Sequence, residues 1–228
     1  GTVIVADAQT SGRGRLGRRW ESKEGSGIWM SVVLRPSIAP EDVQIMTLAA
    51  SVAVVTALKR IAGVDAGIKW PNDIIIDGKK VCGILTEMST EMDRVNFLVL
   101  GIGININQKK EDFPDELKST AISLKAYMSE NNMSVSNIRR NDIIKNVLLE
   151  LEKQYENMKR GNTEEIIRKW RENSVTLGRK VKIIYKNDEY EGMARDVTDD
   201  GKLIVDCCDG ITRAVSSGEV SVKGIMGN

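Results

Sequence analysis

The stretch "GIKWPNDIIIDGKKVCGILTEM", residues 67–88, predicts how the central sheet is built. Two apolar runs flank the dipeptide Asp77-Gly78, which is a strong signal for a two-residue β-hairpin. Before the first run, Pro71 predicts a turn, and Asn72 and Asp73 are residues that turns favour. The stretch therefore predicts a turn, a strand, a tight hairpin and a second strand in direct succession.

Further strands and helices are predicted on both sides of this hairpin. Residues 2–6, "TVIVA", are β-branched and apolar, which predicts a buried strand. Apolar residues at helical spacing predict two long helices, and Asn162 is expected to cap a shorter third helix. The predicted strands beside the hairpin are 2–6, 27–34 and 96–105, and the predicted helices are 41–61, 141–160 and 162–173.

The residue pattern of the sequence changes near residue 177. Short β-type runs follow one another, separated by turn residues such as Asp200-Gly201 and Asp209-Gly210. They predict a small all-β module of about five strands, most consistent with a barrel. We therefore divide the chain into a first domain at 1–176 and a second domain at 177–228. The predicted strands of the second domain are 180–185, 189–197, 202–207, 211–215 and 219–223.

The charge balance argues against a general nucleic-acid-binding protein. The 228 residues include 33 Lys and Arg and 32 Asp and Glu, for a formal net charge of +1, whereas such proteins are usually strongly basic. No histidine is present, which excludes Ser-His-Asp and Cys-His catalysis within this chain. Lys, Asp, Glu or the substrate itself must therefore carry any proton transfer.

Cysteine usage predicts a cytoplasmic protein. Cys82, Cys207 and Cys208 show no disulfide-framework spacing, so reduced thiols are expected. We find no apolar run of the roughly 18 residues that span a membrane and no signal peptide, so no membrane partner is predicted. Because Thr2 already begins a strand after Gly1, we expect an upstream part of the fold to be missing from this sequence.

The stretch "GRGRLGRRW", residues 12–20, holds four arginines and three glycines but no acidic residue. Glycines let the backbone approach a ligand closely, and guanidinium groups match carboxylates and phosphates. Arg13 and Arg15 alternate with glycines, so two guanidiniums can converge on one anion. The alternatives are a solvated basic loop, which is the usual role of a charge run, and, more weakly, an RNA-binding loop.

Three further motifs contain residues that could bind a ligand or take part in catalysis. In "KWPND", 69–73, the turn residues are by themselves more typical of structure than of function. In "GKKVCGIL", 78–85, a regular strand would place Lys80, Cys82 and Ile84 on one face, where Lys80 is either a snorkelling edge residue or a buried cation that needs an anion. The motif "GIGIN", 101–105, is weak as a dinucleotide signal, because no third glycine follows.

Together, the order and spacing of these motifs resemble the biotin protein ligase family. The resemblance also includes "FPDELKSTAISL", 113–124, and "SSGEVSV", 216–222, and covers essentially the whole chain. It implies an α/β (α+β) fold, with a mixed β-sheet packed with helices on one face, followed by a small C-terminal SH3-like β-barrel.

The resemblance implies an ATP-dependent ligase. Members of this family use ATP and Mg²⁺ to convert biotin to biotinyl-5′-AMP, and then transfer biotin to one lysine of a biotin carboxyl carrier protein domain of a biotin-dependent carboxylase. The first step brings a carboxylate to a phosphate, so the site must supply positive charge. Under this interpretation, the arginine-glycine loop supplies part of that charge.

Residue roles follow from the resemblance position by position. Asp73 is implied to orient either Mg²⁺ or the incoming lysine, and the resemblance identifies no other metal ligand. The residues implied to be catalytic are Arg13, Arg15, Asp73 and Lys80. The implied biotin-binding residues are Gln9, Arg13, Gly14, Arg15, Lys80, Gly83, Gly101 and Gly103. The implied ATP- or adenylate-binding residues are Arg13, Arg15, Arg18, Trp20, Lys69, Asn72, Lys80 and Asn105.

Several points stay open at this stage. The family's Ser-Thr-Asn segment, which contacts biotin, is not in this sequence, and neither is the helix-turn-helix domain of some members, so no nucleic acid is predicted as a partner of these residues. The alternatives are a lipoate–protein ligase, which the arginine-glycine loop disfavours, and a fragment of a biotin-sensing repressor. A homodimer through the central sheet is possible, and the acceptor protein is not identified.

Overall fold

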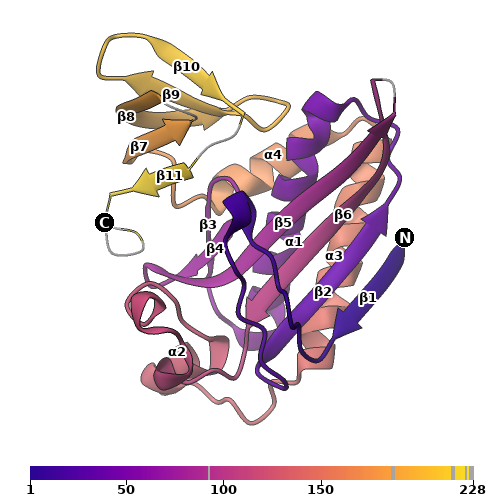
Figure 1. Ribbon diagram of the computed structural model, residues 1–228, viewed down its shortest axis with the longest axis vertical. Coiled ribbons are helices and arrows are strands. Elements are labelled where there is room, and N and C mark those ends of the chain that lie inside the picture. The colour runs from indigo at the N-terminus through magenta and orange to yellow at the C-terminus, as the bar shows by residue number, and fades with distance from the viewer. Residues whose placement is uncertain (92, 186–187, 217–218, 224, 226–228) are drawn as a thin grey trace.

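The computed structural model describes residues 1–91, 93–185, 188–216, 219–223 and 225, which form two β-sheets and four α-helices (Figure 1). The first sheet contains β1 (Thr2–Ala6), β2 (Gly27–Leu34), β3 (Gly67–Lys69), β4 (Asp73–Ile76), β5 (Lys79–Glu91) and β6 (Arg94–Asn105). The helices are α1 (Gln44–Ala62), α2 (Leu124–Glu130), α3 (Arg140–Lys159) and α4 (Thr163–Glu172). The second sheet contains β7 (Lys180–Tyr185), β8 (Asp188–Val197), β9 (Leu203–Cys207), β10 (Thr212–Val215) and β11 (Glu219–Val222).

The first sheet has the strand order β1-β2-β6-β5-β4-β3, and helices pack against one of its faces (Figure 1). Alternate residues of β6, such as Leu98, Leu100 and Ile102, join the buried core with the apolar residues of α1. The α/β fold class is confirmed, but the strand pairs described in this sheet are all antiparallel, so the expected mixed sheet is wrong. Short connections link β3 to β4, β4 to β5 and β5 to β6, and such hairpins make consecutive strands antiparallel. β1 and β2 extend this pattern, because β2 pairs antiparallel with β6 and β1 with β2.

The predicted hairpin at Asp77-Gly78 is confirmed. Both residues have positive φ angles, 49° and 73°, as the two central residues of a type I′ turn require. The register between β4 and β5 then shifts, because Ile74 pairs with Cys82 but Ile75 pairs with Lys80. One extra residue of β5 is thereby accommodated in a β-bulge.

The strand "TVIVA" is present as β1, but the expectation that it is buried is wrong. Its Val3, Ile4 and Val5 side chains are 39%, 58% and 50% exposed. β1 lies at the edge of the first sheet and pairs with β2 alone among the described strands. Apolar composition predicted the strand correctly, but the burial of a strand depends on elements that pack over it.

The predicted helices are confirmed within a few residues, with two corrections. The helical segment Pro40–Ala62 is long and apolar enough to cross a membrane, contrary to the expectation from sequence, but 78% of the window is buried inside the protein, as in the core helix of a folded domain. Asn162 precedes α4 as expected, but its side chain makes no capping hydrogen bond.

The second sheet has the order β10-β9-β8-β7-β11, with every described strand pair antiparallel. Its strands begin and end within about one residue of the predicted positions. Among the described residues no pairing closes this sheet, so the SH3-like barrel stays a prediction, as does the domain boundary between residues 176 and 177. Residues 217 and 218 of "SSGEVSV" lie outside the described residues.

Candidate active site

The long helices α1 and α3 lie on one face of the first sheet (Figure 1). A cavity of about 590 Å³ is lined by residues of the other face, among them Gly83, Gly101 and Gly103. Its walls are the loop at 7–26, the turn at 70–72, the segment 105–121 and two residues of β11, Val220 and Ser221. All fourteen site residues named from the sequence line this one cavity, although they come from separate parts of the chain. They are Gln9, Arg13, Gly14, Arg15, Arg18, Trp20, Lys69, Asn72, Asp73, Lys80, Gly83, Gly101, Gly103 and Asn105.

Positive charge predominates in the cavity wall. Seven of the lining residues are Arg or Lys and four are Asp or Glu, although the net charge of the whole chain is only +1. The cavity is therefore suited to a substrate that carries several negative charges.

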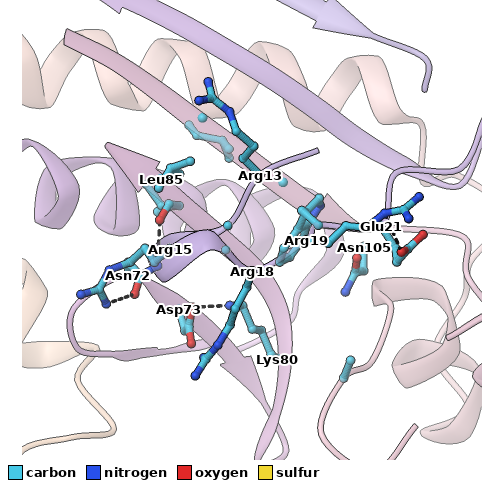
Figure 2. A pocket seen from close by; sticks show the side chains of 18 of the residues that line it. Arg13, Arg15, Arg18, Arg19, Glu21, Asn72, Asp73, Lys80, Leu85 and Asn105 are labelled. Atoms are coloured by element: carbon cyan, nitrogen blue, oxygen red, sulfur yellow. Dashed lines mark hydrogen bonds and ion pairs between the residues drawn. The ribbon is translucent and has the colours of Figure 1, made fainter. Parts of the chain in front are cut away.

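The loop arginines contact different partners. The Arg13 guanidinium forms an ion pair with Glu87 at 3.1 Å, whereas Arg15 Nη1 donates a hydrogen bond to Asn72 Oδ1 at 3.0 Å. In Figure 2, Arg13 points away from Lys80, while Arg18 extends beside it. The structure thus brings Arg15 and Arg18 to the Lys80 side of the cavity and does not bring Arg13 there.

Trp20 lies on a floor made by two glycines of neighbouring strands. A Cβ atom on Gly83 would lie 2.9 Å from Trp20 Cζ3, and one on Gly103 would lie 2.6 Å from Cε2 and Nε1 of the same ring. A side chain at either position would therefore displace the indole. The buried Nε1 of Trp20 has no hydrogen-bond partner among the described residues, so this slot holds a flat ring together with an unused donor.

Lys80 forms an ion pair with Asp73, in which Nζ and Oδ1 are 2.5 Å apart and the two side chains are 23% and 16% exposed. Nζ also lies 5.3 Å from the centroid of the Trp20 ring, where a cation is attracted to the aromatic face. Because the pair is largely shielded from water, Asp73 offsets much of the cost of desolvating the lysine. Lys80 is thus a partly buried cation with a carboxylate partner, as one of the two sequence interpretations proposed.

The bulge between β4 and β5 decides which way Lys80 faces. A Cβ atom on Gly83 would lie 3.2 Å from Lys80 Nζ, so Lys80 shares the cavity side with Gly83. Cys82 and Ile84 belong to the buried core instead. The prediction that Lys80, Cys82 and Ile84 share one face is therefore wrong, because the extra residue of a bulge reverses the alternation. Burial also raises the pKa of the Cys82 thiol, so it stays protonated at neutral pH.

The two asparagines of the motifs are held by buried hydrogen bonds. Asn72 Nδ2 donates to the Ile84 carbonyl at 2.8 Å, and its Oδ1 accepts from Arg15. Asn105 Oδ1 accepts from Gln108 Nε2 at 3.1 Å. These contacts fix both amides, so the loop arginine and the end of β6 are anchored to the sheet.

Two family models match this chain. The model described as "Biotin/lipoate A/B protein ligase family" matches residues 1–105, and "Biotin protein ligase C terminal domain" matches residues 176–223. A biotin--[acetyl-CoA-carboxylase] ligase of Mycobacterium tuberculosis is 34% identical over 225 residues, which cover 96% of this chain and 78% of that protein. The chain belongs to the biotin protein ligase family.

Other relatives agree with this assignment. The bifunctional ligase/repressor BirA of Bacillus spizizenii is 43% identical over 217 residues, 95% of this chain, and the chain spans 65% of the length of that relative. The solved structure of the Aquifex aeolicus biotin protein ligase in complex with biotin and ATP is similar with a TM-score of 0.81 and 30% identity, covering 98% of this chain and 89% of that one.

Sequence reasoning missed two walls of the biotin protein ligase cavity. Phe113, Leu117 and Thr120 line it from the segment after β6, and Val220 and Ser221 line it from the second sheet. The apolar residues of "FPDEL", isolated within a polar loop, were a usable signal for the first wall. The second wall lies in "SSGEVSV", which the resemblance included. Its place at the cavity could not be predicted, because it depends on how the two sheets pack.

Proposed function

We propose that this chain activates biotin with ATP to biotinyl-5′-AMP and then transfers biotin to a lysine of a biotin carboxyl carrier protein domain. The observation that carries this proposal is the convergence of all fourteen motif residues on one cation-rich cavity. The complex of the Aquifex aeolicus relative with biotin and ATP supports it, and the name of the Mycobacterium tuberculosis relative supports a carboxylase acceptor.

In the first step, a carboxylate oxygen of biotin attacks the α-phosphorus of ATP and pyrophosphate leaves. Lys80 and the arginines of the loop offset the repulsion between the two anions and stabilise the charge that builds up at phosphorus. Asp73 holds Lys80 until an anion arrives, so the cation is already oriented when substrate binds. In the second step, the acceptor amine attacks the acyl carbon and AMP leaves, and exclusion of water from the cavity would limit hydrolysis of the adenylate.

Mg²⁺ would neutralise charge on the phosphates of ATP. Among the described residues there is no cluster of three or more Cys, Asp or Glu side chains that could hold a metal ion. A single carboxylate fits the way Mg²⁺ usually binds beside a nucleotide, where phosphates and water supply most ligands. Asp73 is our candidate for that carboxylate, and its alternative role is to orient the acceptor lysine.

The proposal has two further parts. Cys82, Cys207 and Cys208 are all free thiols, which supports a reducing compartment such as the cytoplasm. A homodimer through the first sheet stays a prediction, supported by the exposed apolar edge strand β1.

The test is exchange of labelled pyrophosphate into ATP, with biotin, lipoate or no acid present. The proposal requires exchange that depends on both biotin and Mg²⁺. Exchange driven by lipoate alone would favour the lipoate–protein ligase alternative. If no acid drives exchange, either in this chain or in one extended upstream by the family's Ser-Thr-Asn segment, the activation step assigned to this cavity is wrong. Labelled biotin transferred to a purified carrier domain, but not to one whose acceptor lysine is replaced by arginine, tests the second step.

A further inference from the structure

Trp70 connects the cavity to the second sheet. Its side chain is 1% exposed, and it immediately precedes the Pro71-Asn72-Asp73 turn. Its backbone N–H donates to Thr176 Oγ1 at 2.8 Å, and its indole Nε1 donates to the Gly201 carbonyl at 3.0 Å. Both partners lie more than 100 positions away in the sequence, so distant segments anchor this residue.

Hydrogen bonds within the β8–β9 turn, residues 198–202, fix the position of the Gly201 carbonyl. The Thr198 and Gly201 amides donate to Lys202 O and Thr198 O, each at 2.9 Å. Gly201 has a φ of +87°, and a Cβ atom there would lie 3.1 Å from Leu48 Cδ1 of α1. The turn is therefore wedged between Trp70 and the core helix, and only glycine fits this conformation without strain.

Trp70 in turn precedes the residues that hold the cations of the cavity. Asn72 accepts a hydrogen bond from Arg15, and its backbone carbonyl accepts one from Ile84 N–H at 3.0 Å. The adjacent Asp73 forms the ion pair with Lys80. A shift of Trp70 would move both anchors at once, and misplacement of reacting groups by about 1 Å can reduce a rate by about 100-fold.

We propose that the β8–β9 turn positions residues of the active site. The Gly201 carbonyl holds Trp70, Trp70 fixes the adjacent Asn72-Asp73 turn, and that turn orients Arg15 and Lys80. Trp70 borders the cavity wall, but it is 1% exposed and its indole Nε1 bonds to Gly201. Trp70 and Gly201 are therefore positioning residues in this scheme, acting through Asn72 and Asp73 and not on the reacting atoms. The scheme rests on the proposed function. It gives the second sheet a role in adenylation that is separate from its direct lining of the cavity by Val220 and Ser221.

The first test compares Trp70→Phe with Trp170→Phe. Both tryptophans are fully buried, but the Nε1 of Trp170 has no hydrogen-bond partner among the described residues. Both variants lose similar ring volume, and only Trp70→Phe loses a hydrogen bond. We expect Trp70→Phe to lower kcat of biotin-dependent exchange about tenfold or more, with KM for biotin and ATP within about twofold of the parent. Trp170→Phe should leave kcat within about twofold at a similar unfolding temperature.

The second test acts on the other partner of the bond. Gly201→Ala is compared with Gly210→Ala, because Gly210 has a similar φ of +83° but nothing within 4 Å of the added Cβ. Gly201→Ala should lower kcat, and Gly210→Ala should not. Alanine keeps the backbone carbonyl of residue 201 but displaces the turn that carries it. The double variant Trp70→Phe/Gly201→Ala should be no slower than Trp70→Phe alone, because both changes act through the same hydrogen bond.

A third readout does not depend on activity. Hydrogen exchange of the Ile84 amide reports the placement of Asn72 O, so protection should fall in Trp70→Phe and persist in Trp170→Phe. Equal kcat in the two tryptophan variants, or additive effects in the double variant, would overturn the positioning role. If the parent chain shows no exchange with biotin, even when extended upstream by the family's Ser-Thr-Asn segment, the proposed function fails. The Ile84 amide alone then decides whether Trp70 sets the turn.

Discussion

The two sides of the cavity are built differently. The β4–β5 hairpin and the floor strand β6 hold Lys80, Gly83 and Gly103 in a sheet with a buried core beneath it. In the arginine-glycine loop at 12–20, Arg15 is anchored to Asn72, but Arg13 and Arg19 make contacts at the surface, such as the Arg13–Glu87 pair with side chains 72% and 43% exposed. The difference indicates that the sheet fixes the position of the substrate. The exposed loop arginines add positive charge but contribute little to the stability of the fold.

Lys80→Ala provides the largest expected effect on the sheet side. Removing one preorganised charge from the site should lower kcat of biotin-dependent exchange by roughly 100-fold or more. Lys79→Ala is the matched control, since Lys79 is adjacent in β5 but does not line the cavity, and it should stay within about twofold. Equal losses in the two variants, measured by pyrophosphate exchange, would contradict a specific role for Lys80.

Gly103→Ala tests the floor itself. The new Cβ would lie 2.6 Å from the Trp20 ring, whereas a Cβ on Gly101 would make an ordinary contact of 3.5 Å with the Leu85 carbonyl. We expect Gly103→Ala to displace the indole, change its fluorescence and raise KM for biotin about tenfold. Gly101→Ala should do much less. Identical KM values in the two alanine variants would show that the Trp20 contact does not shape the site.

These contrasts also mark how far the sequence could be interpreted. Asp77-Gly78 predicted the hairpin correctly because a two-residue turn is determined by its own residues. The direction of Lys80 could not be predicted, because a bulge depends on pairing with β4. The exposure of β1 depends on sheet order, and the wall at Val220 depends on contact between the sheets. The spacing of the motifs was enough to predict which residues form the site. The contacts that each of them makes could be identified only in the three-dimensional structure.

Cys82 gives a pH-dependent test of the core beneath the floor. Burial raises the pKa of its thiol above the ordinary value of 9.0. The folded state therefore holds this proton more tightly than the unfolded state, and the resulting stability is full below pH 9 and falls as pH rises above 9. The slope from this group approaches about 1.4 kcal/mol per pH unit as the unfolded-state thiol becomes fully ionised above pH 9. Denaturant unfolding between pH 9 and 10 should show a shallower decline for Cys82→Ala than for the parent; parallel slopes would contradict this assignment.

Arg13→Ala has the smallest expected effect on stability, and it tests whether the loop contributes to the stability of the fold as the sheet does. Exposed ion pairs contribute little because water and salt screen them, so the free energy of unfolding should change by no more than about 0.5 kcal/mol. Arg19→Ala is the control, since Arg19 pairs with Glu21 at 3.1 Å in a similarly exposed setting. Both variants should keep the unfolding midpoint of the parent. Both arginines line the cavity, but the resemblance assigns only Arg13 to the substrate site, so Arg13→Ala should lower exchange activity more than Arg19→Ala. A clear loss of stability in Arg13→Ala would mean that the loop is part of the folded framework, and the division between a structural floor and a charge-supplying loop would be wrong.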